Sequence, residues 1–149
     1  MSCYEQTLLY ASQNGHLEIV QALLKQELNI NCSNIYGWTP LHEAVFNEKF
    51  EIVKILVENG AEINCENEHR GTPLHFASRK GFLEIVKYLV ENGAKIDVQN
   101  INKTCPIHFA VINENCGYEM TEFLLQKGTV TKFEDFSAII NFISCHELS

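Results

Sequence analysis

Apolar residues recur along this chain in short helical stripes that are separated by polar loops. The stripe in 50–57 (FEIVKILV) has apolar side chains at six of its eight positions. A stripe this wide cannot lie on the surface of a protein, so neighbouring elements must cover it. Similar stripes occupy 17–24 and 83–90. A shorter helical pattern precedes each stripe and an extended loop follows it, which predicts a repeated unit of helix, turn, helix and loop.

The unit recurs at a fixed period. TPLH at 39–42 returns at 72–75, and 72 − 39 = 33 residues. CPIH at 105–108 is a degraded copy one period later, and QTLL at 6–9 is a weaker copy one period earlier. An alanine follows two residues after each copy, at Ala11, Ala44, Ala77 and Ala110. A unit of this kind cannot bury its own apolar faces, so neighbouring units must stack.

Capping residues stand at the predicted helix ends. Thr39 and Thr72 precede a proline, which is the order expected of an N-cap followed by a first helical residue that needs no N–H. Glycines stand where a left-handed residue would end the second helix of a unit, at Gly60, Gly93 and Gly128.

The TPLHxA motif, the GHLEIV-type second helix, the NGAxIN exit at 59–64 and the period together closely resemble the ankyrin repeat. The resemblance is strong in 34–101, fair in 1–33 and looser in 102–130. It implies an all-α repeat solenoid in which 1–149 form a single ankyrin-repeat domain. We expect helix-turn-helix-hairpin repeats at about 1–33, 34–66, 67–99 and 100–131, followed by a C-terminal capping helix at 132–149.

Some positions depart from the repeat pattern. The first copy has Glu27 where glycine is usual, as expected of a capping repeat whose outer face meets water. Arg70 precedes Gly71 in the third copy, which suggests that the turn glycine is shifted by one, and Lys103 predicts an irregular hairpin tip in the fourth. The fourth copy also carries two extra residues within 113–118. The cap at 132–149 is expected from an apolar helical stripe formed by Phe133, Phe136, Ile139, Ile140 and Ile143.

Composition narrows the class of partner. The net charge is −8 and the pI is near 5.2, which argues against nucleic acid and anionic membranes, because phosphate binding needs clustered Lys and Arg. The chain shows no secretory signal pattern and no apolar run of about 20 residues. Its six cysteines contain no CxxC pair, which favours reduced structural thiols. We expect an intracellular protein, cytoplasmic with nuclear residence left open, that is a monomer when free.

The residues that could suggest catalysis or metal binding recur with the repeat. His42, His75 and His108 share one repeat position, and stacking would place them about 10 Å apart, which is too far for a shared zinc ion. The resemblance implies that this histidine is structural. No catalytic or phosphate-binding motif is present. We therefore expect no enzyme activity, no metal and no cofactor.

The resemblance implies that hairpin tips and the outward side of the first helices form a concave groove for a protein partner. The residues there differ between units, whereas the framework is kept. We expect the partner to contact Tyr36, Trp38, Phe46, Asn47, His69, Arg79, Lys80, Ile112 and Asn113.

Each of these assignments has a structural alternative. Trp and Tyr are common interface hot spots, which favours Trp38, but this side chain could instead simply pack against the neighbouring hairpin. Arg79 and Lys80 form a basic spot suited to an acidic or carbonyl group, or else a solvated helix end. The lengthened segment 113–118 is equally compatible with a functional loop and with neutral drift.

The pattern as a whole predicts a non-enzymatic adaptor or inhibitor that holds one partner protein in its groove. The alternative is a substrate-recruiting subunit of a larger assembly such as a ubiquitin ligase. A structural or oligomerisation role ranks third, and an enzyme last.

Overall fold

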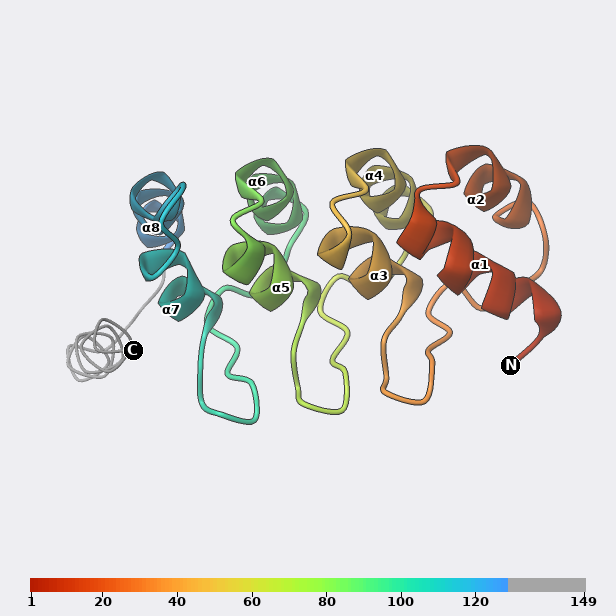
Figure 1. The fold of residues 1–149 in the computed structure, drawn as a ribbon, viewed down its shortest axis with the longest axis horizontal. Coiled ribbons are helices and arrows are strands. Elements are labelled where there is room, and N and C mark those ends of the chain that lie inside the picture. The colour runs from red at the N-terminus through yellow and green to blue at the C-terminus, as the bar shows by residue number, and fades with distance from the viewer. Residues whose placement is uncertain (129–149) are drawn as a thin grey trace.

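The structure is a computed structural model that describes residues 1–128. Within those residues it contains eight helices and no strand, arranged as four pairs in a row (Figure 1). The prediction of an all-α repeat solenoid is therefore confirmed. In chain order the helices are α1 (Cys3–Asn14), α2 (Leu17–Leu23), α3 (Pro40–Phe46), α4 (Phe50–Glu58), α5 (Pro73–Lys80), α6 (Leu83–Glu91), α7 (Pro106–Val111) and α8 (Gly117–Gln126).

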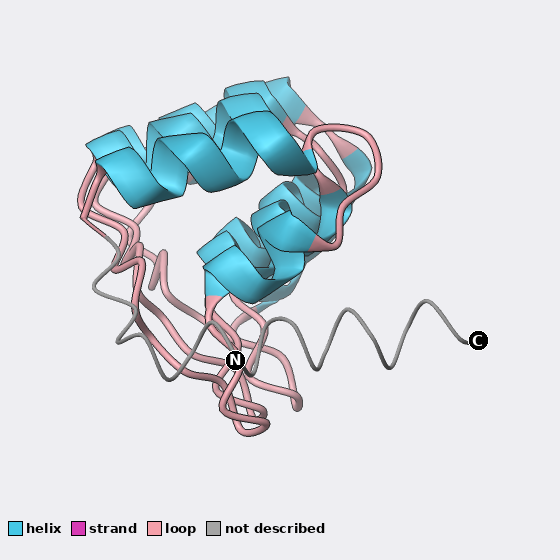
Figure 2. Ribbon diagram, turned by 90° about the vertical axis from the view of Figure 1, so that its left-hand side faces the viewer, coloured by secondary structure: helices cyan, strands magenta, loops and turns pink. Residues whose placement is uncertain are grey.

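The helices form two layers. We call α1, α3, α5 and α7 the inner helices and α2, α4, α6 and α8 the outer helices (Figure 1). The long loops between successive pairs extend away from both layers and run along one edge of the stack. Seen along the stack, the helices of each layer superpose and the loops hang beside the inner layer (Figure 2).

The buried core repeats with the period of the sequence. Each inner helix contributes one large aliphatic side chain that is 0–1% exposed, at Leu8, Leu41, Leu74 and Ile107. The alanines of the motif lie beside them and are equally buried, which allows inner and outer helices to approach closely. The outer helices complete the core with Leu23, Leu56, Leu89 and Leu124.

Helix ends follow the predicted capping chemistry. The Thr39 backbone N–H donates to His42 Nδ1 at 3.2 Å, and the His42 backbone N–H donates to Thr39 Oγ1 at 3.4 Å. At the end of α4, Gly60 has a φ of 87°, and the Ala61 N–H reaches back to the Leu56 carbonyl at 2.9 Å. This is the Schellman arrangement that glycine favours.

The first outer helix ends earlier than its equivalents. Helix α2 stops at Leu23 after 7 residues, whereas α4 and α6 each have 9. Glu27 occupies the position at which Gly60 and Gly93 adopt a left-handed conformation in the later repeats. A residue with a Cβ atom makes that cap costly, so the helix finishes in an ordinary turn instead.

The hairpin tips correct two expectations from the sequence. Gly37, Arg70 and Lys103 have φ values of 75°, 57° and 58°, so the left-handed residue stays in the same register in all three tips. The turn in the third repeat is therefore not shifted to Gly71, and the fourth tip is regular. The reason is an asparagine three residues earlier in each tip: the side chain of Asn100, for example, accepts from the backbone N–H groups of Asn102 and Thr104.

Polar groups join each repeat to the next. His42 and His75 hydrogen-bond through Nε2 to the carbonyl oxygens of Gly71 and Thr104, at 2.9 and 3.0 Å. The side chain of Asn31 accepts from the Glu62 N–H at 2.8 Å, as does that of Asn64 from the Lys95 N–H one repeat later. The hairpins themselves are linked through the Tyr36 and His69 carbonyls. The histidines thus have the structural role that the resemblance implied.

The fourth helix pair carries the predicted insertion between its helices. The segment joining α7 to α8 covers 112–116, whereas Gly81 and Phe82 alone join α5 to α6. Helix α7 has 6 residues and is the shortest of the described helices. The predicted C-terminal cap at 132–149 lies outside the described residues.

Candidate functional site

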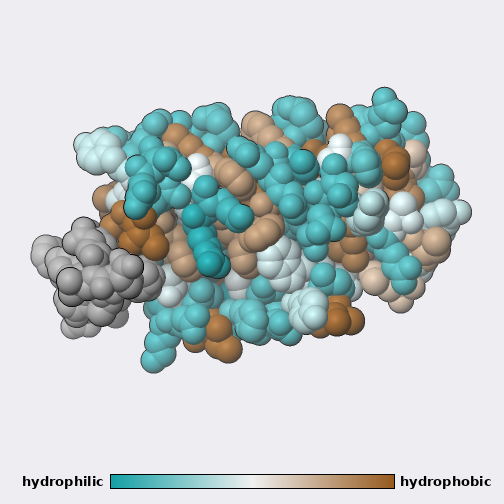
Figure 3. All heavy atoms as spheres, viewed as in Figure 1, coloured by the Kyte–Doolittle hydropathy of each residue, from teal (hydrophilic) through white to brown (hydrophobic). Residues whose placement is uncertain are grey.

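The inner helices and the hairpin loops meet along a corner that runs the length of the stack. In the second repeat a ring contact joins the two sides of this corner: Trp38, which ends the first hairpin, has its ring centroid 5.2 Å from that of Phe46 at the end of α3. The corner is the region in which the sequence predicted a groove. It lies on the side of the molecule drawn in Figure 3, where apolar groups interrupt the hydrophilic surface beside the hairpin edge.

Three aromatic rings from two repeats form a cluster in this corner. The centroids of Trp38 and Phe76 are 4.7 Å apart, and Phe46 lies 6.1 Å from Phe76 in an edge-to-face arrangement. We call Trp38, Phe46 and Phe76 the aromatic corner. All three side chains are half-buried, so each keeps part of its surface open to water. The Trp38 ring thus contacts one ring on α3, Phe46, and one on α5, Phe76.

Basic side chains border the aromatic corner. The Lys80 Nζ lies 4.2 Å from the centroid of the Phe46 ring, within the range of a cation–π interaction. Arg79 is exposed in the last turn of the same helix, α5. Within residues 1–128 neither side chain has a carboxylate within salt-bridge distance, whereas Lys54 lies 2.7 Å from Glu51 and Lys87 lies 3.3 Å from Glu119.

Sequence reasoning missed the position that follows the histidine of each motif. Glu43, Phe76 and Phe109 occupy it in successive repeats, and the structure places Phe76 in the aromatic corner. Glu43 is half-buried, and this burial raises the pKa of its carboxyl group. The signal was present as the variable x of TPLHxA, because a residue that varies inside a fixed motif is free to serve a purpose other than folding.

The remaining predicted residues are spread along the same edge. Tyr36 is 54% exposed at the hairpin tip and makes no ring contact with the aromatic corner. His69 is exposed at the next tip, with Nε2 3.4 Å from a Glu68 carboxylate oxygen. Asn47 is half-buried and donates to the Glu43 carbonyl at 2.9 Å. The corner therefore brings together Trp38, Phe46 and Lys80, with Tyr36 and His69 at its hairpin rim.

The two residues predicted from the fourth repeat, Ile112 and Asn113, have different surroundings. Ile112 is half-buried directly after α7. Asn113 is held in the junction between repeats: its Nδ2 donates to the Arg79 carbonyl at 3.3 Å, and its Oδ1 accepts from two backbone N–H groups of the insertion. A Cβ atom added at Gly81 would lie 2.7 Å from Asn113 Nδ2, so the Asn113 side chain occupies the space above that glycine.

One cysteine and one histidine lie close enough together to raise the question of nucleophilic chemistry. Cys65 Sγ is 3.6 Å from His42 Nδ1. Burial raises the pKa of the Cys65 thiol to about 11 and lowers the pKa of His42 to about 4, so both groups are held neutral. His42 Nδ1 already accepts from the Thr39 N–H. The pair therefore has neither a thiolate nor an available base.

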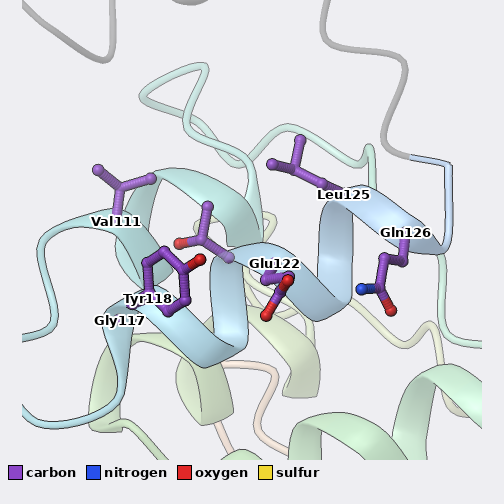
Figure 4. A pocket seen from close by; sticks show the side chains of 7 residues that line it. Val111, Gly117, Tyr118, Glu122, Leu125 and Gln126 are labelled. Atoms are coloured by element: carbon purple, nitrogen blue, oxygen red, sulfur yellow. The ribbon is translucent and has the colours of Figure 1, made fainter.

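A second concave region lies at the end of the stack. Helices α7 and α8 border an open hollow of about 730 Å³, and Figure 4 shows Val111, Tyr118 and Leu125 around it. This is the face on which a further helix pair would stack in a repeat protein, and such end faces need a cover. We therefore regard it as a seat for capping structure and the aromatic corner as the candidate binding site.

The family model for ankyrin repeats (3 copies) matches residues 2–67 and again residues 60–135. The two matches together span most of the chain and agree with the helix pairs and hairpins described above. The chain belongs to the ankyrin repeat family. Comparison with curated proteins found no match.

Ankyrin repeats are in general non-enzymatic modules that bind other proteins, and the aromatic corner lies where the inner helices meet the hairpins of this ankyrin stack. Among residues 1–128, no helix is both long and apolar enough to span a membrane. No three His, Cys, Asp or Glu side chains in the same range are grouped so that they could hold a metal ion.

Proposed function

We propose that this ankyrin protein is a non-enzymatic adaptor or inhibitor that holds one partner protein in the groove between its inner helices and hairpins. The observation that carries the proposal is the aromatic corner: three half-buried rings from two repeats, bordered by two cations that have no carboxylate partner within residues 1–128. A protein that needed these rings only for its core would bury them fully, as it does Leu41 and Leu74.

The chemistry of the corner suits protein recognition. Aromatic side chains bring a large contact area at a small cost in conformational entropy, and Trp and Arg are enriched among interface hot spots. The rings also contact one another, so their positions are set before a partner arrives. A preformed site of this kind loses little entropy on binding.

The positions that stay the same from repeat to repeat and the positions that vary lie in different parts of each repeat. The second, third and fourth repeats keep a capping threonine or cysteine, a proline and a histidine, all four repeats keep the buried aliphatic residue, and these side chains face the core or the next repeat. The corner position held by Phe46 is Arg79 in the next repeat and Ile112 in the one after it. Variation there changes the binding surface without changing the fold.

Three further features support an intracellular, non-catalytic role. His42 and His75 are buried, and both ring nitrogens of each are engaged within the stack. Cys3, Cys32, Cys65 and Cys116 are free thiols. The Cys65 thiol is kept protonated at neutral pH. We propose that the free protein is monomeric, since its groove is occupied only when the partner binds.

The test is an affinity capture from the source cell extract with the 149-residue chain as bait. The groove variant is Trp38→Ala with Phe46→Ala. The control is Ile19→Ala, which removes an exposed apolar side chain from an outer helix away from the corner and from the hollow at the end of the stack. Circular dichroism and thermal unfolding establish that both variants are folded.

We expect wild type and the control to capture the same protein and the groove variant to lose it. Capture by the folded groove variant together with loss by the outer-helix control would contradict the proposal, because it would place the contact on the opposite layer. Retention by both variants would contradict it as well, and would direct attention to the insertion around Tyr118.

A further inference from the structure

Several basic residues of the described range, among them Arg79, Lys80, Lys25 and Lys95, have no carboxylate partner, and Arg79 and Lys80 are the ones that border the aromatic corner. The protein is acidic, with 11 Lys and Arg against 19 Asp and Glu. Lys54, Arg70 and Lys87 each have a carboxylate partner within 4.0 Å. Arg79 and Lys80 are exposed and have none within residues 1–128, although acidic side chains are abundant. Their charges are therefore available to an incoming group.

These two cations lie directly beside the apolar surface of the aromatic corner. Lys80 lies over Phe46 at 4.2 Å, Phe46 contacts Trp38, and Trp38 contacts Phe76. One ligand of a few residues can therefore touch rings and cations together. Arg79 holds in α5 the position that Phe46 holds in α3, because 79 − 46 = 33 residues separate them.

The acidic groups along the same edge make the charge around the corner asymmetric. Glu43 lies on α3, where its burial raises the pKa of the carboxyl group. Glu68 at the hairpin tip lies 3.4 Å from its neighbour His69, and Glu66 pairs with Arg70. Acidic groups thus border the corner on the α3 and hairpin sides, and unpaired basic groups border it on the α5 side.

Building on the proposed function, we propose that the groove binds an acidic protein segment in which a carboxylate side chain stands next to an aromatic or branched aliphatic residue. The apolar residue packs on Trp38, Phe46 and Phe76. The carboxylate binds Arg79 and Lys80, where the planar guanidinium of Arg79 can donate two parallel hydrogen bonds.

Charge complementarity favours this class of ligand over others. A basic segment would place cations against Arg79 and Lys80 and leave both without a partner. Nucleic acid needs many phosphate contacts from clustered Lys and Arg, whereas the corner offers two cations in a chain of net charge −8. A short acidic segment needs only the two cations that the corner supplies.

Short random peptides displayed on phage provide the probe, and the immobilised 149-residue chain is the target. Enriched peptides are synthesised, and their affinities are measured by fluorescence polarisation. The test variant is Arg79→Glu with Lys80→Glu. The matched control is Lys25→Glu with Lys95→Glu, which changes the net charge equally at two exposed lysines outside the corner. Phe46→Ala reports on the apolar half of the site, and a charge-neutral pair, Arg79→Gln with Lys80→Gln, serves if the reversal unfolds the chain.

We expect the enriched peptides to carry Asp or Glu beside Phe, Trp, Leu or Ile. Arg79→Glu with Lys80→Glu should weaken their binding by about tenfold or more, and raised salt should weaken it in wild type. Lys25→Glu with Lys95→Glu should leave affinity nearly unchanged.

Two results would overturn the acidic-ligand inference while leaving the groove in place: peptides that need Phe46 but show no acidic bias, or equal affinity for wild type and the charge-reversed variant. The latter would make Arg79 and Lys80 a solvated helix end only. Tighter binding of a single-stranded oligonucleotide than of any acidic peptide would overturn it too. Peptides that bind without any dependence on Phe46 or Trp38 would instead refute the proposed function itself.

Discussion

His42 in one repeat donates a hydrogen bond from Nε2 to the carbonyl oxygen of Gly71 in the next, over 2.9 Å. The Nδ1 atom of the same ring accepts from the Thr39 N–H, so the imidazole is neutral and its only N–H proton lies on Nε2. Protonation at Nδ1 would break the cap of α3. The junction between repeats is therefore sensitive to pH.

We expect the protein to lose stability as the pH falls from about 6.5 to about 4. Burial lowers the pKa of His42 from 6.5 to about 4, so in that window the unfolded state binds a proton that the folded state does not. The effect of His42 on the free energy of unfolding is absent above pH 6.5. It grows to a loss of about 3 kcal/mol as the pH falls to 4, relative to neutral pH. The lowered pKa of His75 acts in the same direction. Urea unfolding at pH 7 and pH 4.5 measures the loss.

The control for this prediction is His42→Gln, which cannot bind the proton. We expect it to be less stable than wild type at neutral pH and to show a flatter dependence on pH. An equal pH dependence in wild type and His42→Gln would show that other groups cause the loss.

The aromatic corner predicts a spectroscopic effect. Trp38 is the only tryptophan, and its closest ring neighbour is Phe76. Phe76→Ala should expose the indole, shift its emission to longer wavelength, raise its quenching by acrylamide and cost about 1–2 kcal/mol of stability. Phe109→Ala, whose ring contacts His75 rather than Trp38, is the matched control. A spectrum unchanged by Phe76→Ala would contradict the geometry of the corner.

The left-handed hairpin residue of the fourth repeat predicts a stabilising substitution. Lys103 has a φ of 58°, a conformation that costs a residue with a Cβ atom about 1–2 kcal/mol relative to glycine. After the greater entropy of glycine in the unfolded chain is allowed for, Lys103→Gly should stabilise the protein by about 0.5–1 kcal/mol. Asn102→Gly in the same tip, where φ is not left-handed, should destabilise it. Chemical denaturation distinguishes the two, and the opposite order would contradict the assignment of the turn.

A buried hydroxyl predicts a second stabilising change. Ser78 is 0% exposed, and its Oγ has no hydrogen-bond partner within the described structure. The equivalent positions in the adjacent repeats are Val45 and Val111. Removing the unpaired hydroxyl with Ser78→Ala should raise stability by about 1 kcal/mol. Ser33→Ala, at an exposed serine, should have little effect; a loss of stability on Ser78→Ala would mean that the hydroxyl is satisfied in solution.

Stability should also vary along the stack. Helix α7 is short, and the insertion lengthens the connection to α8. Because repeat proteins gain stability from each repeat and from each interface, we expect gradual unfolding in which the fourth helix pair opens first. Hydrogen exchange should be fastest in α7 and α8 and slowest in α3 to α6. Protection of α8 equal to that of α4 would refute this order.

The sequence by itself determined the architecture of this protein. The period, the TPLH copies and the glycines at 60, 93 and 128 specify where helices begin and end, because capping and apolar periodicity act within a few residues of chain. The same pattern specifies the buried ladder of Leu8, Leu41, Leu74 and Ile107, since each repeat presents the same face to its neighbours.

The tertiary structure alone decided how the variable positions combine. Phe76 joins Trp38 across 76 − 38 = 38 residues, and Asn113 lies over Gly81 rather than open to the groove. The left-handed conformation of Arg70 and Lys103 likewise follows from the asparagine bonds of their tips and not from their own preferences. Contacts of this kind depend on the offset between stacked repeats. No single repeat encodes that offset, because it results from packing two whole units against each other.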